Sequence, residues 1–401
     1  MAICSAACTN KKVSVATKPN QSSIQSEDIS LSKNYPVVVY GASGYTGRLI
    51  IEHLRDLGVP FVAAGRSRER IVEALQHVPG IENAEYEIVE VEHTVEALTK
   101  LLTGRKVICN TVGPFKRFNL EVAEACLRAG VHYLDTTGEQ AAVRQIDEAF
   151  GKDFAKAGLV MVPSLAMQYA ISEIAAQFCL EVPGVDSLEM HEVCEAVPTV
   201  GSANTILDSA CQPFHYLKDN QLVPYKKIEV SQISTPGGQV LTATSWGGST
   251  NPLWFANDGR VRNCKMDVAM WNQTLYQKQL DLERLYFTTL QWIPEQQLQP
   301  ILDNMARGIT ASMPPRESRG VHRSIDWCMA TGNNVAVKAT IFSTGGYLQT
   351  GLLQAYGARR LICETPRVSG FRSPSQVFGH HELLGSLKSF GYAALQVERL
   401  V

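Results

Sequence analysis

The stretch VVVYGASGYTGRLIIEHL (Val37–Leu54) joins four apolar residues to three closely spaced glycines and then to an apolar-periodic helix. Gly41 allows a sharp turn at the end of a strand, Gly44 leaves room for a pyrophosphate at the backbone, and Gly47 lets the helix pack close to the strand. The free N–H groups at the start of such a helix bind phosphates. We therefore predict a dinucleotide-binding turn with these residues at the ligand: Gly41, Ser43, Gly44, Tyr45, Thr46 and Gly47.

Strand and helix patterns alternate from Pro36 to about Met161. The expected strands are Val37–Gly41, Phe61–Gly65, Glu85–Val91, Lys106–Thr111, Tyr133–Asp135 and Gly158–Val162. The expected helices are Tyr45–Leu57, Arg68–His77, Val95–Leu102, Leu120–Ala129 and Gln140–Lys156. Short apolar runs that alternate with helices of about ten residues predict a parallel sheet with right-handed crossovers. We expect an α/β domain with a doubly wound parallel sheet (Rossmann type) and its ligand at the carboxyl ends of the strands.

The end of the second expected strand indicates which dinucleotide binds. An NAD site carries a carboxylate there, which accepts hydrogen bonds from the 2′-hydroxyl of the adenosine ribose. This chain has no acid before Glu69 and offers Arg66 and Ser67 instead. A guanidinium group and a hydroxyl suit a 2′-phosphate, which a carboxylate would repel. The residues therefore favour NADP (NADPH) over NAD.

Two further loops follow the carboxyl ends of strands. ICNTVGPFKRFN (Ile108–Asn119) turns the chain at the nicotinamide end of the crevice, and Asn119 is expected as a helix N-cap. HYLDTTGE (His132–Glu139) is rich in polar residues, which at a strand end in this fold usually face the ligand. The predicted cofactor contacts are Gly113, Pro114 and Phe115, and the predicted catalytic residues are Tyr133, Asp135, Tyr169, Lys116 and Glu139.

The catalytic candidates have different expected roles. Tyr133 or Tyr169 would supply a proton or hold a developing oxyanion, and Asp135 or Glu139 would orient the substrate. Two alternatives stay open, because a buried tyrosine is more often part of the core and Lys116 could contact a cofactor phosphate instead of donating a proton.

Composition excludes several classes of function. The chain has 401 residues, 45% of them apolar, which is enough for two or three domains. Its formal net charge is −2 and its Lys and Arg residues are scattered, so we expect a small-molecule ligand and no nucleic acid. No apolar run approaches the roughly 18–20 residues of a membrane span, so no stable membrane insertion is expected. A homodimer stays open.

The cysteines argue against a disulfide framework. The ten cysteines stand singly, without CxxC pairs, which is typical of reduced thiols inside a cell. HEVC (His191–Cys194) has the residue types of half a metal site, but no second pair stands at ligand spacing. A core strand is the favoured interpretation of this segment, and we predict no metal.

The first 33 residues differ in kind from the rest. MAICSAACTNKKVSVATKPNQSSIQ has no Asp or Glu, is rich in Ser, Ala and Lys, and shows no periodicity. A disordered tail on a cytoplasmic protein is the favoured interpretation. An organelle transit peptide of the plastid type is the alternative, because acid-poor and Ser-rich leaders have this composition.

Five motifs in the same order resemble the saccharopine-dehydrogenase-like oxidoreductase family. They are the glycine turn, AGRS (Ala64–Ser67), VICNTVGPF (Val107–Phe115), EACLRAGVHYLDTTGE (Glu124–Glu139) and GGYLQTGLLQAYGARRL (Gly345–Leu361). The resemblance covers a dinucleotide-binding domain at about residues 36–163 and implies NADP-linked or NAD-linked redox chemistry. It also implies an inserted α+β domain that lies over the nicotinamide.

One departure limits what the resemblance implies about the substrate. After the sixth strand the family usually has a Gly-Phe-Asp-Ser-x-Pro-like turn, whereas this chain reads SLAMQYA (Ser164–Ala170). The family's aspartate is absent, so a saccharopine-type amino-acid substrate is not expected. GSANTILDSA (Gly201–Ala210) does resemble the family's helix start in the second domain.

Four parts of the chain are expected. They are the tail at 1–33, the dinucleotide-binding domain at 34–165, an α+β substrate or cover domain at 166–342, and a C-terminal segment at 343–401 that returns to the first domain. In the cover domain, the patterns at Ser187–Ala196, Ile228–Ile233 and Gln239–Ser245 predict an antiparallel sheet, and those at Thr205–Asp219 and Val268–Leu290 predict helices. The Trp-rich loop Ser245–Asn263 is either a substrate lid or a loop anchored in the core.

These patterns predict an NADPH-dependent reductase in specialised metabolism. Its substrate would be a small or medium organic molecule with a C=N, C=O or activated C=C bond. The alternative is a non-catalytic NADP-binding sensor or scaffold, which would keep the glycine turn without catalytic donors. The polar DTTGE loop and the large second domain favour the enzyme, because a sensor needs no cover over its ligand.

Overall fold

Strand β1 (Val37–Tyr40) and helix α1 (Tyr45–Asp56) form at the glycine-rich stretch, as the sequence predicts. All four residues of β1 are buried, and α1 buries the apolar face that carries Leu49, Ile50 and Leu54. The computed structural model describes residues 35–195, 198–210, 212–225, 229–245, 249–309 and 312–401. The tail predicted at 1–33 lies outside the described residues.

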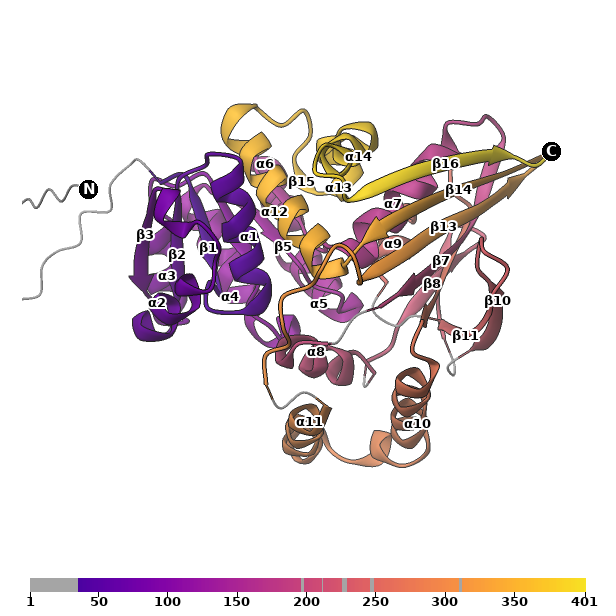
Figure 1. The fold of residues 1–401 in the computed structure, drawn as a ribbon, viewed down its shortest axis with the longest axis horizontal. Helices are drawn as coiled ribbons and strands as arrows, with labels where there is room; N and C mark the ends of the chain where they lie inside the picture. The colour runs from indigo at the N-terminus through magenta and orange to yellow at the C-terminus, as the bar shows by residue number, and fades with distance from the viewer. Residues whose placement is uncertain (1–34, 196–197, 211, 226–228, 246–248, 310–311) are drawn as a thin grey trace, which may run out of the picture. The chain divides into compact units, whose positions relative to one another are not determined.

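The first sheet has seven strands, all parallel (Figure 1). In spatial order they are β15 (Gly370–Phe371), β6 (Val160–Val162), β5 (His132–Asp135), β4 (Val107–Asn110), β1, β2 (Phe61–Gly65) and β3 (Tyr86–Glu90). The direction in which successive strands are added reverses between β1 and β4, which is where sheets of this kind bind their ligands. The predicted doubly wound sheet is confirmed, with each predicted strand within two residues of the observed one.

Helices connect these strands. They are α2 (Arg68–Gln76), α3 (Val95–Leu102), α4 (Phe115–Ala129), α5 (Gln140–Ile146) and α6 (Lys152–Lys156), with a π-type turn at Asp147–Gly151 between the last two. Two predictions were wrong. Helix α4 begins at Phe115 and not at Leu120, so Asn119 is not an N-cap: it lies buried inside α4, where its side-chain amide donates to the Ala142 carbonyl oxygen.

The second sheet is mixed. Its main order is β10 (Val230–Ser234), β11 (Val240–Ser245), β12 (Asn263–Met270), β7 (Val185–Cys194), β13 (Arg323–Gly332), β14 (Val335–Thr344) and β16 (Ala393–Arg399), and β8 (His215–Lys218) and β9 (Gln221–Pro224) form a hairpin beside β12. Strands β7 and β12 are parallel, because the chain crosses over between them, and the other pairs are antiparallel. Two of the predicted strands, β10 and β11, do pair antiparallel, but the sheet as a whole is mixed because β12, which was not predicted as a strand, lies parallel to β7.

Helix boundaries in the second half also differ from the predictions. Helix α8 (Val200–Ala210) ends well before Asp219, because the chain turns into β8. Helix α10 (Gln273–Thr288) begins after β12, so Val268–Met270 is strand and not helix. Two further helices follow α10, η3 (Leu290–Trp292) and α11 (Glu295–Ile309), and a 3-10 turn, η1 (Ile81–Asn83), precedes β3 in the first half.

The Trp-rich loop supports the core-anchored interpretation. It contains helix α9 (Asn251–Phe255), in which Trp254 and Phe255 are 3% and 2% exposed. Trp254 packs against Tyr169 and Ala166. Residues 246–248 of this loop, and residues 196 and 228 of the predicted strands, lie outside the described residues.

Helix α7 (Met167–Leu180) covers one face of the second sheet, and its side chains are almost all buried. Helix α12 (Gly346–Cys363) packs against α1, with which it lies side by side in Figure 1. The last part of the chain, with α13 (Pro374–Phe378) and α14 (His380–Ser389), contributes β15 to the first sheet and β16 to the second.

Three chain segments connect the parts built on the two sheets, and the first two are hydrogen-bonded to each other. The first runs from β6 into α7, the second leads from β14 into α12, and the third runs from β15 through α13 and α14 to β16. The Met167 N–H donates to Thr350 Oγ1 over 3.1 Å, and the Gln354 amide donates to the carbonyl oxygens of Leu165 and Asp135 over 2.9 and 2.6 Å. Among the described residues, no helix is long and apolar enough to cross a membrane.

Candidate functional site

The glycine-rich turn has the shape of a phosphate-binding loop. Gly41 has a φ of +91°, and a Cβ there would lie 2.4 Å from Thr111 Oγ1. A Cβ at Gly47 would lie 2.4 Å from the Gly41 carbonyl oxygen, so glycine lets α1 begin this close to β1. Gly44 is the N-cap of α1, and no side chain caps the helix. The first N–H groups of α1 are therefore available to a pyrophosphate.

A cavity of about 670 Å³ begins at this turn and continues to the second sheet. Its first part is bordered by Ser43, Gly44, Tyr45, Thr46, Arg66, Arg70, Thr111, Gly113, Phe115, Thr136 and Gly138, which follow β1, β2, β4 and β5. Its second part is bordered by the start of α7, by Glu192 and Cys194 of β7, by α8, and by Val268, Met270, Tyr276 and Tyr347. One cavity thus joins the expected cofactor site to the second sheet.

Most predicted cofactor residues border this cavity, and one arginine was missed. Ser67 does not border it: its hydroxyl caps α2 by accepting from the Arg70 N–H over 3.3 Å. Gly47 and Pro114 shape the backbone beside the cavity, and the Gly113–Pro114 peptide is cis.

Arg70, which was not predicted, borders the cavity together with the exposed Arg66. The run of arginines in GRSRER was the sequence signal that could have found Arg70.

Tyr133 and Asp135 form a buried pair behind the cavity. Both are fully buried, and the Tyr133 hydroxyl donates to Asp135 Oδ2 over 2.7 Å. The other Asp135 oxygen accepts from the N–H groups of Thr137 and Ser164 over 2.9 and 2.8 Å. Burial raises the pKa of Asp135 to about 6 and raises that of Tyr133 well above its usual value. The pair ties the ends of β5 and β6 together and does not border the cavity.

Glu139 and Lys116 also have partners within the fold. The Glu139 carboxylate accepts from the N–H groups of Phe115 and Lys116 over 2.7 and 2.9 Å, and so caps the N-terminus of α4. Burial raises the pKa of Glu139 to about 7, although these N–H groups oppose that shift. The Lys116 ammonium donates to Gln212 Oε1 over 2.9 Å. Neither residue borders the cavity.

Tyr169 is the catalytic candidate that does border the cavity. It lies in the first turn of α7 and is 6% exposed. Its hydroxyl packs against Gly138 of the DTTGE loop, where a Cβ would lie 1.7 Å from the oxygen. Tyr169 therefore lies where the loop after β5 meets α7.

Glu192 and Asp326 form a second buried acidic pair, which sequence reasoning missed. They are directly opposite each other on the antiparallel strands β7 and β13, and both are 0% exposed. The Ser172 hydroxyl donates to Asp326 Oδ1 over 2.7 Å. The other Asp326 oxygen and both Glu192 oxygens have no hydrogen-bond partner among the described residues. A pairing of residues 134 positions apart leaves no signal in a single sequence.

A short segment between α11 and β13 crosses the glycine turn; we call residues 312–317 the strap. The Tyr45 hydroxyl donates to the Pro315 carbonyl oxygen over 3.0 Å and accepts from the Glu317 N–H over 2.8 Å. Arg316 forms a bidentate ion pair with Glu52 of α1. Ser312 and Met313 of the strap border the cavity. The strap therefore covers the start of α1.

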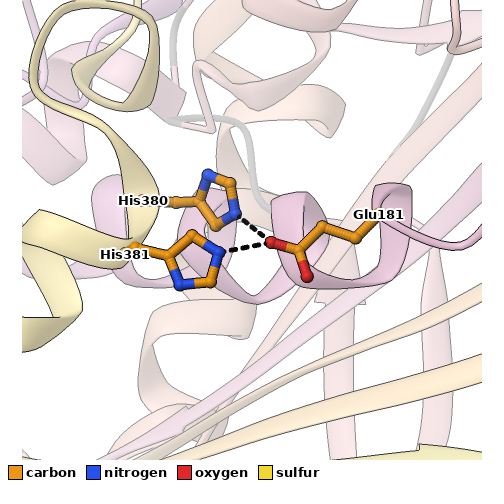
Figure 2. A group of neighbouring side chains, drawn as sticks. All are labelled: Glu181, His380 and His381. Carbon is orange, nitrogen blue, oxygen red and sulfur yellow. Dashed lines mark hydrogen bonds and ion pairs between the residues drawn. The ribbon is translucent and has the colours of Figure 1, made fainter.

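Glu181, His380 and His381 form a cluster apart from the cavity (Figure 2). Glu181 is the C-cap of α7, and the two histidines begin α14. Both Nε2 atoms lie within hydrogen-bond distance of Glu181 Oε1, at 2.7 and 2.5 Å. The hydrogen bond from His380 is the main reason that the pKa of Glu181 is lowered. These residue types are also metal ligands.

Comparisons with known proteins agree with this arrangement. Residues 37–162 match the family described as "Saccharopine dehydrogenase NADP binding domain". The apo saccharopine dehydrogenase (L-Glu forming) from Saccharomyces cerevisiae has the same fold, with a TM-score of 0.57 and 12% identity over 91% of this chain and 99% of that chain. The fold and the turn thus place the chain in the class of proteins that have a saccharopine-dehydrogenase-type fold with an NADP-binding domain.

Within this class, the chain belongs to the family described as "Family of unknown function (DUF5938)", which matches residues 170–398, more than half of its length. A lipid droplet localized protein of Caenorhabditis elegans is 28% identical over 36% of this chain and 36% of its own length. A trans-acting enoyl reductase of Mycobacterium ulcerans is 33% identical over 33% of this chain and 32% of its own length. The chain thus spans about a third of the length of the curated relatives that it matches.

Proposed function

We propose that the chain is an NADPH-dependent reductase of a small or medium organic substrate. This proposal rests on one observation, which is that a continuous cavity joins the glycine turn to the second sheet. A reductase needs cofactor and substrate side by side, out of water, with a proton donor nearby. When bound, NADPH supplies the hydride for the reduction of a C=N, C=O or activated C=C bond.

Residues of the chain bind the cofactor, donate the proton and position the loops of the site. The uncapped start of α1 at Gly44 binds the pyrophosphate, and Arg66 and Arg70 pair with the 2′-phosphate. Tyr169 donates a proton to the substrate or a hydrogen bond to a developing oxyanion. Tyr133, Asp135, Glu139 and Lys116 position the loops around the site and do not touch the substrate.

The relatives favour one type of bond. The mycobacterial relatives are named trans-acting enoyl reductases, which favours reduction of a C=C bond conjugated to a carbonyl group. The segment Ser164–Ala170 lacks the aspartate that is usual in the family, and this departure disfavours an amino-acid substrate. We propose that the protein acts in the cytoplasm, with a homodimer as an open alternative to a single chain.

A titration of NADPH, followed by its fluorescence, tests the cofactor site. Gly44→Val would place a branched side chain where the phosphates lie, so affinity should fall at least about tenfold, or ~1.4 kcal/mol. Gly385→Val changes a glycine of α14 that has open space around it and no positive φ, and it serves as a control that leaves the cofactor site untouched. Unchanged NADPH affinity in Gly44→Val would refute the proposed cofactor site.

A substrate screen tests the reaction. The wild-type protein and NADPH are offered imines, ketones and enones, and the loss of NADPH absorbance is followed. The rival function is an NADP sensor, which is favoured by one observation: four of the five predicted catalytic residues do not border the cavity. Tight NADPH binding without reduction of any substrate class would support the sensor over the reductase.

A further inference from the structure

The end of the cavity far from the glycine turn carries almost no charge. Among the residues that border the cavity, the charged ones are Arg66 and Arg70, at the end of β2 and in α2, and Glu192, on β7. The wall of the far end has an apolar part, which includes Met167, Val200, Ile206, Val268 and Met270, and an uncharged polar part, which includes Thr199, Ser202, Asn204 and Ser209. A substrate carboxylate buried there would need a cationic partner, and the described residues at this end offer none.

Glu192, the one acid at this end, has the surroundings of a neutral carboxyl. The groups that face it are Gln168 from α7, Cys194 from its own strand and Asp326 from β13, which in turn faces Ser172. Two opposed carboxyls in a dry site cannot both ionise, and no cation among the described residues faces them. Burial and the neighbouring Asp326 raise the pKa of Glu192 well above its usual value, against the opposite effect of Cys194 and Gln168, and burial raises the pKa of Asp326. This environment favours the neutral form of the Glu192 carboxyl, which can donate a hydrogen bond.

We infer that the substrate is an uncharged molecule with an apolar chain, whose carbonyl oxygen accepts a hydrogen bond from the Glu192 carboxyl. This inference rests on the proposed reductase function and specifies the substrate of that site. The apolar wall would hold the chain, and the carbonyl oxygen would give Glu192 the partner that neither of its oxygens has in the structure. The same wall excludes amino acids and free carboxylates, because it cannot neutralise them.

Binding without turnover tests this inference separately from the reduction. The protein is saturated with NADP⁺, and the affinities of 2-decanone and of decanoate are measured by calorimetry. The ketone should bind at least about tenfold more tightly than decanoate. Tighter binding of decanoate, or no binding of the ketone, would overturn the inference. Failure of NADP⁺ itself to bind would instead reject the proposed function.

Variants of Glu192 locate the hydrogen bond. Glu192→Gln keeps a donor and should change the affinity for the ketone less than about threefold, whereas Glu192→Met removes the donor and should weaken it about fivefold to tenfold. Glu173→Gln is the matched control, because Glu173 is equally buried on α7 but accepts from the Ser375 N–H and does not border the cavity. Full ketone affinity in Glu192→Met would contradict the inference. The infrared carbonyl band of protonated carboxyls at pH 7 should lose one component in Glu192→Gln, at a frequency unaffected in Glu173→Gln, which gives a readout independent of ligand.

The cluster in Figure 2 supports a second inference, independent of the first. The possible ligand atoms of Glu181, His380 and His381 all lie within 4.8 Å of one another. The Phe178 ring contacts both imidazoles edge to face, with centroids 4.9 and 4.8 Å away, and so holds them in place. Glu181 also lies at the C-terminus of α7, where the helix dipole favours a cation. Two imidazoles and a carboxylate are a ligand set that zinc takes, with water as the fourth ligand.

We propose that this cluster binds one zinc ion, which would link α7 to α14. The protein is first stripped with a chelator, and zinc uptake and the melting temperature are then measured. One zinc per chain should bind and raise the melting temperature, and Glu181→Gln and His380→Ala should each abolish both effects. His77→Ala, an exposed histidine away from the cluster, is the control and should change neither. Equal uptake by Glu181→Gln, or no uptake by the wild-type protein, would overturn the proposal.

Discussion

Single residues show how the same sequence signal serves ligand binding or the fold itself. The loop after β5 is polar, as the sequence predicts for a ligand site. However, the carboxylates of Asp135 and Glu139 accept hydrogen bonds from backbone N–H groups of neighbouring segments. Each helix start and strand end in a buried crevice leaves N–H groups that need acceptors. A polar run at a strand end therefore predicts a crevice but does not say which of its residues face the ligand.

Tyr169 and Tyr133 separate these two roles experimentally. Tyr169→Phe should lower kcat by about 10²–10⁴-fold, the usual effect of losing a proton donor, with NADPH affinity unchanged. Tyr133→Phe removes the hydrogen bond to Asp135, so it should lower stability by ~1–3 kcal/mol and leave kcat nearly unchanged. Steady-state kinetics and urea unfolding of both variants check this. The reverse pattern would mean that the substrate lies against β5.

Arg66 and Arg70 should set the choice of cofactor together. Arg66→Asp places a carboxylate where the 2′-phosphate is expected and should shift preference from NADPH to NADH, through loss of a charge-assisted pair of ~1.5–3 kcal/mol. Arg70→Ala should weaken NADPH binding and leave NADH binding unaffected. The control is Arg68→Ala, because the Arg68 side chain donates to the Ile88 carbonyl oxygen and does not border the cavity. A wild-type preference for NADH would refute the assignment.

At the scale of elements, the first sheet could be predicted and the second only in part. Most strands of the first sheet are short, largely apolar runs followed by a turn, and such runs mark their own ends; the two-residue β15 was not predicted. In the second sheet, β8 (HYLK) and β12 (NCKMDVAM) mix apolar and polar residues in patterns that fit a helix as well as a strand, and the neighbouring strands decide. The start of α4 was missed because its cap, Glu139, stands 24 residues away from Phe115.

The strap is an element that the sequence reveals only as a linker. Its contacts join residues 264 to 272 positions apart, so no local pattern shows them. Tyr45→Phe removes both hydrogen bonds of the Tyr45 hydroxyl to the strap, and we expect NADPH to dissociate several-fold faster because the strap borders the cavity. Stopped-flow displacement of NADPH measures this rate. Tyr356→Phe, which loses a contact to Arg360 on the surface of α12, should not change it.

For the whole molecule, buried carboxyls predict the pH dependence of stability. Burial raises the pKa of Asp135 to about 6 and those of Glu139 and Glu173 to about 7, from ordinary values of 3.8 and 4.5. Between the ordinary and the raised values the folded chain keeps protons that the unfolded chain releases, so the free energy of unfolding falls as pH rises.

Urea unfolding in steps from about pH 6.5 to about pH 8 should show this decline in the free energy of unfolding. Below this range the buried His132 and His191, whose pKa values burial lowers to about 4, contribute with the opposite sign, because the unfolded chain binds more protons at these rings. Glu173→Gln cannot ionise, so its decline should be shallower than that of the wild-type protein. A stability that rises over this range would contradict the assignment of these groups as protonated in the folded chain.

The segments that connect the two sheets have a mechanical consequence. Two of them are hydrogen-bonded through Thr350 and Gln354, and the third, with α13 and α14, packs against α7 and α12, so the three act as one hinge. A body attached along one line can swing about that line but cannot slide away from it. The strap contacts α1 through segments that are far in sequence from this hinge. Its hydrogen bonds to Tyr45 and Glu52 hold it against α1, and we call these bonds the latch. Entry of a cofactor should therefore require the latch to open while the hinge stays intact, which makes Tyr45 and Glu52 the positions where the rate of opening can be changed without altering the chemistry.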